Sequence, residues 1–270
     1  MSRKLTLECW SRKRERELSV LLTSLHNQTF KNWDLTLLEE ADTNYLGDRI
    51  IVGLLRRLKN QGHKIIFLHP KRILGCVESA VAVMRETCTP YAMKLDDDHL
   101  FEPDVLERMV KILDENPDVG AVGGMLYPID RELHYMEKIP SDFNRWTGKK
   151  KRIWNDYSTL TFRFPEQVVE VDFVRAPFMY RADLLREAGF LEIYPTLGYS
   201  PMAHRIESEI CNTLKKEYDL KIVIDTGAIM WHYLSPTGGC RMIPPETRIH
   251  DDQIYYRRWK EFHKDKPLTD

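Results

Sequence analysis

The sequence predicts an α/β protein built on a mostly parallel sheet with helices on both faces. Short apolar segments of strand length alternate, through the first half of the chain, with segments that carry apolar residues at helical spacing. Polar clusters directly follow the apolar segments, and in such sheets they meet at the carboxyl ends of the strands, where ligands bind. With 270 residues, the chain can bury a sizeable hydrophobic core.

The first two strands are expected over residues 5–10 and 33–38, with a helix between them. That helix has one apolar face, formed by leucines at positions 18, 21, 22 and 25. The first strand ends in the polar run Ser11 to Arg14, and the second ends at Glu39 and Glu40. Two strand ends therefore present polar side chains to the ligand-binding edge of the sheet.

The third and fourth strands are expected over residues 64–68 and 91–95. Helices with apolar side chains at helical spacing precede them, over residues 48–60 and 77–87. A regular alternation of strand and helix requires crossover connections, and it therefore predicts a parallel sheet.

The fourth strand is followed at once by Asp96, Asp97, Asp98 and His99. Three adjacent carboxylates repel one another, and a divalent cation relieves that repulsion because hard cations prefer oxygen ligands. We expect a helix to begin directly behind them at Glu102-Pro103, with proline at its first position. This pattern of strand, acidic turn and helix predicts a metal site, and the alternative is a solvated acidic turn.

The second half of the chain is less regular. Further strands are expected over residues 119–122, 168–174, 178–180, 221–225 and 228–232, the last two separated by a turn. Helices are expected over residues 183–187 and 206–216 and close to the C-terminal end. From about residue 127, aromatic residues are interleaved with basic ones, which suits a sugar platform, a nucleic-acid surface or a hydrophobic cluster. Residues 235–248 are rich in proline and glycine and are expected to form a mobile loop.

Composition restricts the partners and the compartment. The formal net charge is −1, so no bulk positive field recruits nucleic acid. The five cysteines are scattered and form no CxxC pair, which suits a reducing compartment. The N-terminus shows no signal-peptide pattern, and no apolar run approaches the ~20 residues of a membrane span. We therefore expect a cytoplasmic protein, with peripheral membrane contact left open.

Several motifs, in the right order, resemble the family 2 glycosyltransferases, an inverting group with the GT-A fold. Residues 18–34 look like the passage of that family from its first helix to its second strand. Residues 95–98 are similar to its LDxD metal motif, and residues 178–190 resemble its acceptor-side segment. Residues 207–210 stand where the family has ED-x-[DE]-L, and His232 matches a histidine that closes the metal site in many members.

This resemblance covers about residues 5–232 and implies a GT-A fold, with a Rossmann-like and mostly parallel sheet. It divides the chain into a donor-binding half (1–126), an acceptor-binding and catalytic half of the same domain (127–234), and a flexible loop with a C-terminal helix (235–270). The implied activity is inverting transfer of a sugar from a nucleoside-diphosphate sugar to a hydroxyl of a saccharide or another acceptor, with Mn²⁺ or Mg²⁺ as cofactor.

The resemblance also implies roles for the acidic turn. Asp98 would hold the metal ion, and His232 would complete its coordination. A carboxylate–imidazole set suits Mn²⁺ better than Mg²⁺. Asp96 would face the ribose of the donor, and Asp97 would support the turn. The alternative for His232 is a histidine packed at a strand end.

Four further residues are expected on the donor side. Glu39 and Glu40 are placed to accept hydrogen bonds from the nucleobase, although the family usually has two aspartates there. Arg72, in the loop after the third strand, is a candidate partner of the diphosphate. Ser11 lies in the first loop, which lacks the usual Pro-x-x-Asn of the family. The alternatives are a solvated strand end for the glutamates and a surface position for the arginine.

An inverting transfer needs a base beside the acceptor hydroxyl, and Glu207 stands in the place of the catalytic aspartate of the family. Partial burial and like-charge crowding by Glu209 are expected to bring the pKa of Glu207 close to neutral. The alternative is that both are exposed acids of a first helical turn, favoured by the helix dipole. The loop over residues 235–248 follows directly on His232 and is expected to act as a lid.

Two other functions stay open at this point. A sugar-1-phosphate nucleotidyltransferase of similar fold usually carries a glycine-rich loop after its first strand, whereas the run Ser11 to Arg14 has no glycine. A catalytically inactive module that binds nucleotide sugars would keep the acidic set without turnover.

Overall fold

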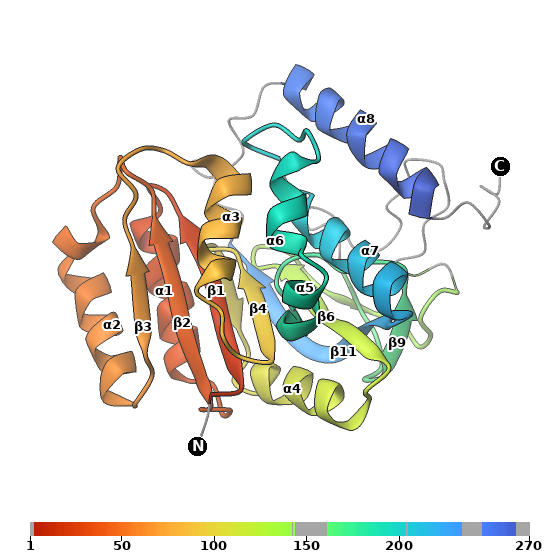
Figure 1. The fold of residues 1–270 in the computed structure, drawn as a ribbon. Coiled ribbons are helices and arrows are strands. Elements are labelled where there is room, and N and C mark those ends of the chain that lie inside the picture. The colour runs from red at the N-terminus through yellow and green to blue at the C-terminus, as the bar shows by residue number, and fades with distance from the viewer. Residues whose placement is uncertain (1–2, 142, 144–160, 204, 234–244, 263–270) are drawn as a thin grey trace.

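The computed structural model describes residues 3–141, 143, 161–203, 205–233 and 245–262, whose arrangement is shown in Figure 1. Within these residues, nine strands form one sheet with the order β3-β2-β1-β4-β10-β6-β11-β5, and β9 also pairs with β11. The strands of this sheet are β1 (Leu5–Ser11), β2 (Trp33–Glu39), β3 (Ile65–Leu68), β4 (Tyr91–Leu95), β5 (His99–Phe101), β6 (Val119–Pro128), β9 (Val168–Val171), β10 (Phe178–Arg181) and β11 (Lys221–His232).

The helices alternate with these strands in the first half of the chain, as predicted. They are α1 (Glu15–His26), α2 (Arg49–Asn60), α3 (Gly75–Arg85), α4 (Val105–Glu115), α5 (Ala182–Glu187), α6 (Phe190–Ile193), α7 (Ile206–Tyr218) and α8 (Pro245–Phe262), with single 3₁₀ turns η1 (Tyr45–Gly47) and η2 (Tyr194–Thr196). The short strands β7 (His134–Tyr135) and β8 (Phe162–Arg163) pair with each other outside the main sheet. None of the helices in the described ranges is both long enough and apolar enough to cross a membrane.

The sheet is mostly parallel, which confirms the predicted fold class. Strands β3, β2, β1 and β4 are parallel neighbours, and β6 is parallel to β11. Strand β10 runs antiparallel between β4 and β6, while β5 and β9 run antiparallel to β11. The right-hand part of the sheet in Figure 1 is therefore mixed, and the left-hand part is purely parallel.

Two hydrophobic cores lie on opposite faces of this sheet because successive strand residues point to opposite sides. Leu5 and Leu7 of β1 face the core formed with α1, α2 and α4. Ala92 of β4 and Tyr180 of β10 face the core formed with α3, α5, α6 and α7 (Figure 1). Full burial of one such leucine is worth roughly 1.5–3 kcal/mol. Both faces of the sheet are thus covered, and the ends of the strands remain for a site.

Strand β11 corrects the predicted pair of short strands. It is continuous from Lys221 to His232, and its register against β6 shifts between Asp225 and Ile229. The predicted turn at Thr226 and Gly227 is therefore an irregularity within one strand, because a bulge absorbs the extra residues without reversing the chain. This continuity carries His232 far enough along the sheet to reach the acidic turn.

The segment behind the acidic turn also differs from the prediction. His99 to Phe101 form β5, which pairs with the end of β11. Helix α4 begins at Val105 with Asp104 at its N-cap position, so Pro103 precedes the helix instead of opening it. A three-residue strand is too short to show a periodicity of its own in the sequence.

The C-terminal helix begins earlier than predicted. Residues 245–248, expected to belong to the mobile loop, form the first turn of α8. The rest of the proposed lid up to residue 244 lies outside the described residues, as does the basic run 149–152. In Figure 1, α8 lies on the outside of the α6 and α7 layer.

Candidate active site

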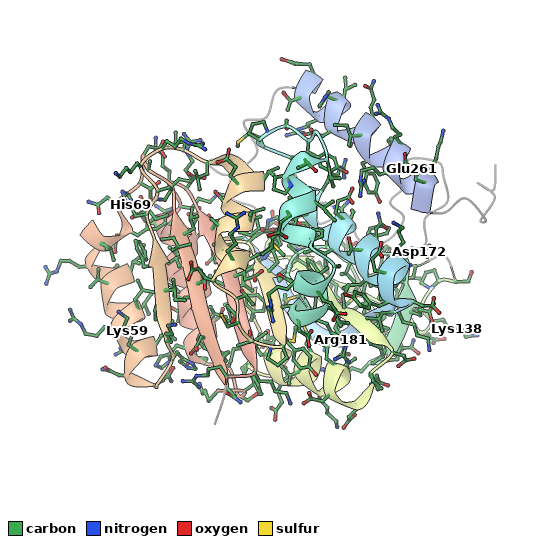
Figure 2. All side chains as sticks on the ribbon, viewed as in Figure 1. Lys59, His69, Lys138, Asp172, Arg181 and Glu261 are labelled. Atoms are coloured by element: carbon green, nitrogen blue, oxygen red, sulfur yellow. The ribbon has the colours of Figure 1, made fainter. Side chains whose placement is uncertain are left out.

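The carboxyl ends of β1, β2 and β4 lie next to one another because these strands are parallel neighbours. Ser11 pairs in register with Glu39, and Cys9 pairs with Leu95, the last residue before the three aspartates. In Figure 2 the labelled His69 lies at this same end of the sheet, just beyond β3. The strand ends predicted to form a site therefore do meet.

Arg14, at the N-cap of α1, is bound within the acidic turn. Its Nη1 atom lies 2.7 Å from Asp97 Oδ1 and 2.9 Å from Asp98 Oδ2. Ser11 Oγ donates a hydrogen bond to Asp97 Oδ2 at 2.6 Å. Burial raises the pKa of Asp97 to about 6, with Arg14 acting in the opposite direction. Asp97 and Asp98 are each 4% exposed, so the interpretation as a solvated acidic turn is wrong.

Asp98, His99 and His232 come together where β4, β5 and β11 meet. One ligand atom from each lies within 4.8 Å of the others, and His232 Nε2 is 3.2 Å from Asp98 Oδ2. The pairing of β5 with β11 sets His99 opposite His232, with ring centroids 5.1 Å apart. Burial would raise the pKa of Asp98, but the two histidines and Arg14 outweigh burial and hold it below its usual value. A carboxylate with two imidazoles is a set that holds divalent transition-metal ions.

Lys94 lies on β4 between the acidic turn and the first turn of α7. Its Nζ atom is 2.6 Å from Asp96 Oδ1 and 2.9 Å from Glu207 Oε1. Burial would raise the pKa of Glu207, but Lys94 outweighs burial, and the pKa lies below its ordinary value. The prediction of a near-neutral pKa for Glu207 is therefore wrong. The like charge that acts most strongly on Glu207 is Asp96.

Glu209 lies on the same helical turn but binds a different part of the molecule. The Tyr199 hydroxyl donates to Glu209 Oε1 at 2.6 Å. Arg258 of α8 donates to both carboxylate oxygens at 2.9 Å. Glu209 is fully buried, and the side chain of Glu207 is only 14% exposed, so neither is an exposed first-turn acid. Glu209 ties α8 to α7 and does not join the acidic cluster through these contacts.

Glu39 and Glu40 are both buried, so they are not a solvated strand end. Glu39 accepts hydrogen bonds from the backbone N–H of Tyr45 and, at 2.9 Å, from Nδ1 of His69. Glu40 accepts three hydrogen bonds of 2.8 to 3.1 Å from the start of α3, donated by Leu74 N, Gly75 N and Ser79 Oγ. Both carboxylate oxygens of Glu40 therefore cap a helix, while its backbone N–H donates to Ser11 O at 3.2 Å, and Glu39 pairs in register with Ser11.

Arg72 is placed on the surface. Its side chain is 65% exposed and pairs with Glu78 of α3 at 2.5 Å. The alternative interpretation, a surface arginine, is thus the one that the structure shows, and Arg72 is not brought into the acidic cluster by this contact.

Three residues of the cluster were missed as site residues: Arg14, Lys94 and His99. Arg14 belongs to the polar run after β1, and the sequence pattern does not indicate that its partners are Asp97 and Asp98. Lys94 interrupts an apolar strand, and a lysine at such a position is rarely buried unless it is paired. His99 directly follows the three aspartates, but nothing in the sequence pattern indicates β5, whose pairing with β11 brings His99 to His232.

The chain matches the family model "Glycosyl transferase family 2" over residues 11–189. The bifunctional glycosyltransferase pgtA of Dictyostelium discoideum is 28% identical over 109 residues, which are 39% of this chain and 14% of that protein. An uncharacterized glycosyltransferase of Methanocaldococcus jannaschii is 23% identical over 146 residues, 54% of this chain and 49% of the other. The chain thus matches less than half the length of either curated relative.

Solved structures share the fold. The mannosyltransferase PcManGT from Pyrobaculum calidifontis, in complex with GDP-Man and Mn²⁺, has a TM-score of 0.63 at 13% identity and covers 99% of this chain and 66% of its own. Residues 1–349 of TarS from S. aureus, in complex with UDP-GlcNAc, give 0.61 at 12% identity, with coverage of 99% and 74%. These are GT-A glycosyltransferases, which confirms the predicted GT-A fold. The family match ends before Glu207 and His232, so their roles depend on geometry.

Proposed function

The chain belongs to glycosyl transferase family 2, and we propose that it transfers a sugar, with inversion, from a nucleoside-diphosphate sugar to an acceptor hydroxyl. The observation that carries this proposal is the arrangement in which the buried Lys94 connects the acidic turn to a separate carboxylate, Glu207. A donor site and a base are needed on opposite sides of the transferred sugar. The nucleotide sugars named in the two similar structures support the class of donor. The family match favours this reaction over nucleotidyl transfer.

A divalent metal ion fits at Asp98, His99 and His232. Their ligand atoms lie within 4.8 Å of one another. Among the described residues, the buried Nδ1 atom of His99 has no hydrogen-bond partner, which is expected of a ligand-binding imidazole. The imidazoles favour Mn²⁺ over Mg²⁺. When bound, the ion supplies Lewis-acid stabilisation of the departing diphosphate.

The strand ends of β1 and β2 are proposed to hold the nucleoside. Glu39 lies beside Ser11 in register and can accept a hydrogen bond from the base or the ribose. Asp96 is assigned to a ribose hydroxyl because, at 38% side-chain exposure, it is the most accessible of the three aspartates. Asp97 holds Arg14 and Ser11, and so fixes the shape of the turn.

Glu207 is proposed as the base. Its Oε1 atom is engaged by Lys94, so we assign the acceptor proton to Oε2. As the acceptor oxygen bonds to the anomeric carbon, the bond from that carbon to the diphosphate breaks, and the hydroxyl proton passes to Glu207. The lowered pKa keeps this carboxylate ionised at neutral pH and therefore ready to accept.

The test is a screen of UDP- and GDP-sugars with Mn²⁺, in which release of the nucleoside diphosphate is followed with and without EDTA. We expect release from at least one donor, its loss in EDTA, and its loss in Glu207→Gln. The control is Glu115→Gln on α4. Glu115 is exposed and pairs only loosely with Lys111, so this variant should keep its activity. A rise in melting temperature with Mn²⁺ and nucleoside diphosphate, without release from any donor, would identify an inactive binding module instead.

A further inference from the structure

Lys94 is an unusual residue for the middle of a sheet. Its side chain is 5% exposed, and its Nζ atom touches two carboxylates that belong to different parts of the proposed reaction: Asp96 on the donor side at 2.6 Å and Glu207 on the acceptor side at 2.9 Å. The ammonium also lies 5.0 Å from the ring centre of Trp10. A buried lysine with two anionic partners keeps its charge, because each partner offsets part of its desolvation.

We propose that Lys94 is the positioning residue of the base: it holds Glu207 in the ionised form and fixes one of its oxygens, so that the other faces the acceptor. This inference rests on the proposed function, in which Glu207 takes the acceptor proton. The ammonium acts through the glutamate and does not itself touch the reacting atoms. Its contact with Asp96 places the base at a fixed distance from the donor turn.

The charged groups around Glu207 show why the ammonium of Lys94 determines whether this carboxyl group is ionised. Asp96 faces it from the turn after β4 and opposes ionisation, whereas Lys94 on β4 favours it. Tyr194 of η2 and Cys211 of α7 also lie in its field, and both have raised pKa values, chiefly because they are buried, so both are neutral. Without Lys94, Glu207 would lose its opposite charge and would still face Asp96. An opposite charge in direct contact lowers a carboxyl pKa by roughly one to three units, so its removal should raise the pKa of Glu207 by about as much.

The experiment compares Lys94→Met, which keeps the length of the side chain but removes its charge, with Lys94→Arg, which keeps the charge. The pH dependence of kcat is measured with the donor found in the screen. We expect the acid limb of Lys94→Met to move upward by roughly one to three pH units, with activity recovered at high pH. In Lys94→Arg the acid limb should stay at its wild-type pH, whatever the absolute rate, because the charge is kept. A merely structural lysine would lower the rate equally at every pH, and that outcome would overturn the inference.

A second readout does not depend on turnover. Carbon-13 NMR of protein labelled at the glutamate carboxyls, with Mg²⁺ present, follows the titration of Glu207, whose signal is identified by its loss in Glu207→Gln. Its pKa should rise in Lys94→Met. In Asp96→Asn, which removes the neighbouring negative charge, the pKa of Glu207 should fall below the wild-type value. This second variant still tests the inference if Lys94→Met does not fold.

The two readouts separate the inference from the proposed function. If the pKa of Glu207 stays unchanged in both variants, Lys94 does not control it, and the inference is wrong whatever the enzyme does. If the pKa rises in Lys94→Met while the rate profile does not move, Glu207 is not the base. The proposed function then fails at that residue, and the positioning role fails with it, although the Lys94 pairing is real.

Discussion

Two glutamates on the α7 side of the sheet, the buried Glu8 and the largely covered Glu207, meet different partners. Glu8 lies on β1 and pairs in register with Lys94, but its carboxylate accepts hydrogen bonds from two hydroxyls, Thr87 Oγ1 at 2.5 Å and the Tyr180 hydroxyl at 2.6 Å. Burial raises the pKa of Glu8 to about 7, and the hydrogen bonds only partly oppose it. Glu207 is held by the ammonium of Lys94, and its pKa lies below the ordinary value.

The difference shows that burial alone does not determine the charge of a carboxyl group. Both side chains lose hydration, which favours the neutral form. Neutral hydroxyl donors cannot make up for that loss, whereas a cation in direct contact can. At Glu8, where the partners are hydroxyls, burial prevails, whereas at Glu207 the ammonium of Lys94 in direct contact favours the charged form. Lys94 is directed to Glu207 rather than to Glu8.

The largest expected effect comes from Glu207→Gln. Glutamine keeps the size of the side chain but cannot take a proton, so turnover should fall by ~10²–10⁴. Donor affinity, measured by calorimetry with Mn²⁺ present, should stay close to wild type because the proposed base acts on the side of the sugar opposite the diphosphate. The matched variant is Glu8→Gln, which should keep its turnover at neutral pH. If turnover fell equally in Glu207→Gln and Glu8→Gln, the assignment of Glu207 alone as the base would be wrong.

The second effect is the pH dependence of stability that Glu8 causes. Its carboxyl has a pKa of about 7 in the folded protein and an ordinary value of 4.5, with Thr87, Tyr180 and Arg186 as the groups that act on it. Between these values the folded state holds a proton that the unfolded state has lost, so stability falls as pH rises. The loss is about 3 kcal/mol once pH exceeds the folded pKa.

Glu8→Gln should abolish that loss. Urea unfolding of wild type and variant at several pH values between 5 and 8 gives the difference in unfolding free energy, in which the other titrating groups cancel. We expect the unfolding free energy of Glu8→Gln to rise relative to that of wild type as pH rises. A difference that is flat across this range would show that Glu8 is charged throughout, like Glu207.

A third effect extends the comparison to a carboxylate held by imidazoles. Asp98→Asn should weaken Mn²⁺ binding by at least about 10–100-fold, since it removes a proposed metal ligand that His232 and Arg14 keep ionised. Electron paramagnetic resonance of free Mn²⁺ measures this directly and does not need activity. Asp114→Asn, whose carboxylate pairs with Lys4 on the surface, is the control. Unchanged Mn²⁺ binding in Asp98→Asn would place the metal elsewhere.

The smallest effect concerns Glu209, the neighbour of Glu207 on α7. Because Glu209 binds Arg258 and Tyr199, Glu209→Gln should cost stability, about 1–2 kcal/mol, and change turnover only a few-fold. Thermal unfolding and the donor assay on one preparation give both numbers. The exposed Glu246→Gln on α8 should change neither. A loss of turnover in Glu209→Gln as large as in Glu207→Gln would show that the base has been assigned two residues too early.

Much of the fold could be predicted because its signals are local. Strands β1 to β4 and the helices between them show apolar periods that a parallel sheet preserves, and the polar strand ends follow from them. Strand β11 was divided in two because Thr226-Gly227 is a turn signal, whereas pairing with β6 on one side and with β5 and β9 on the other holds the chain straight. Tertiary pairing overrode the local preference there.

The site was predicted less completely than the fold. The aspartates, Glu207 and His232 can be proposed from the sequence because they stand at strand or helix ends that a motif marks. The partners of these residues depend on which side chains a distant element brings close, and Lys94 and Glu207 meet only after α7 packs on the sheet. The pairing of Glu209 could not be predicted for the same reason. Its partner Arg258 lies on α8, and no sequence pattern connects the two residues.

Strand β10 has a consequence for how the chain acquires its structure during synthesis. It lies antiparallel between β4 and β6, so the centre of the sheet is completed by residues 178–181. Until that segment leaves the ribosome, β4 and β6 each expose an unpaired edge, and such edges pair readily with other chains. A chain cut after residue 126 would keep the acidic turn but lack its central strand. We therefore expect that fragment to aggregate rather than to bind donor on its own.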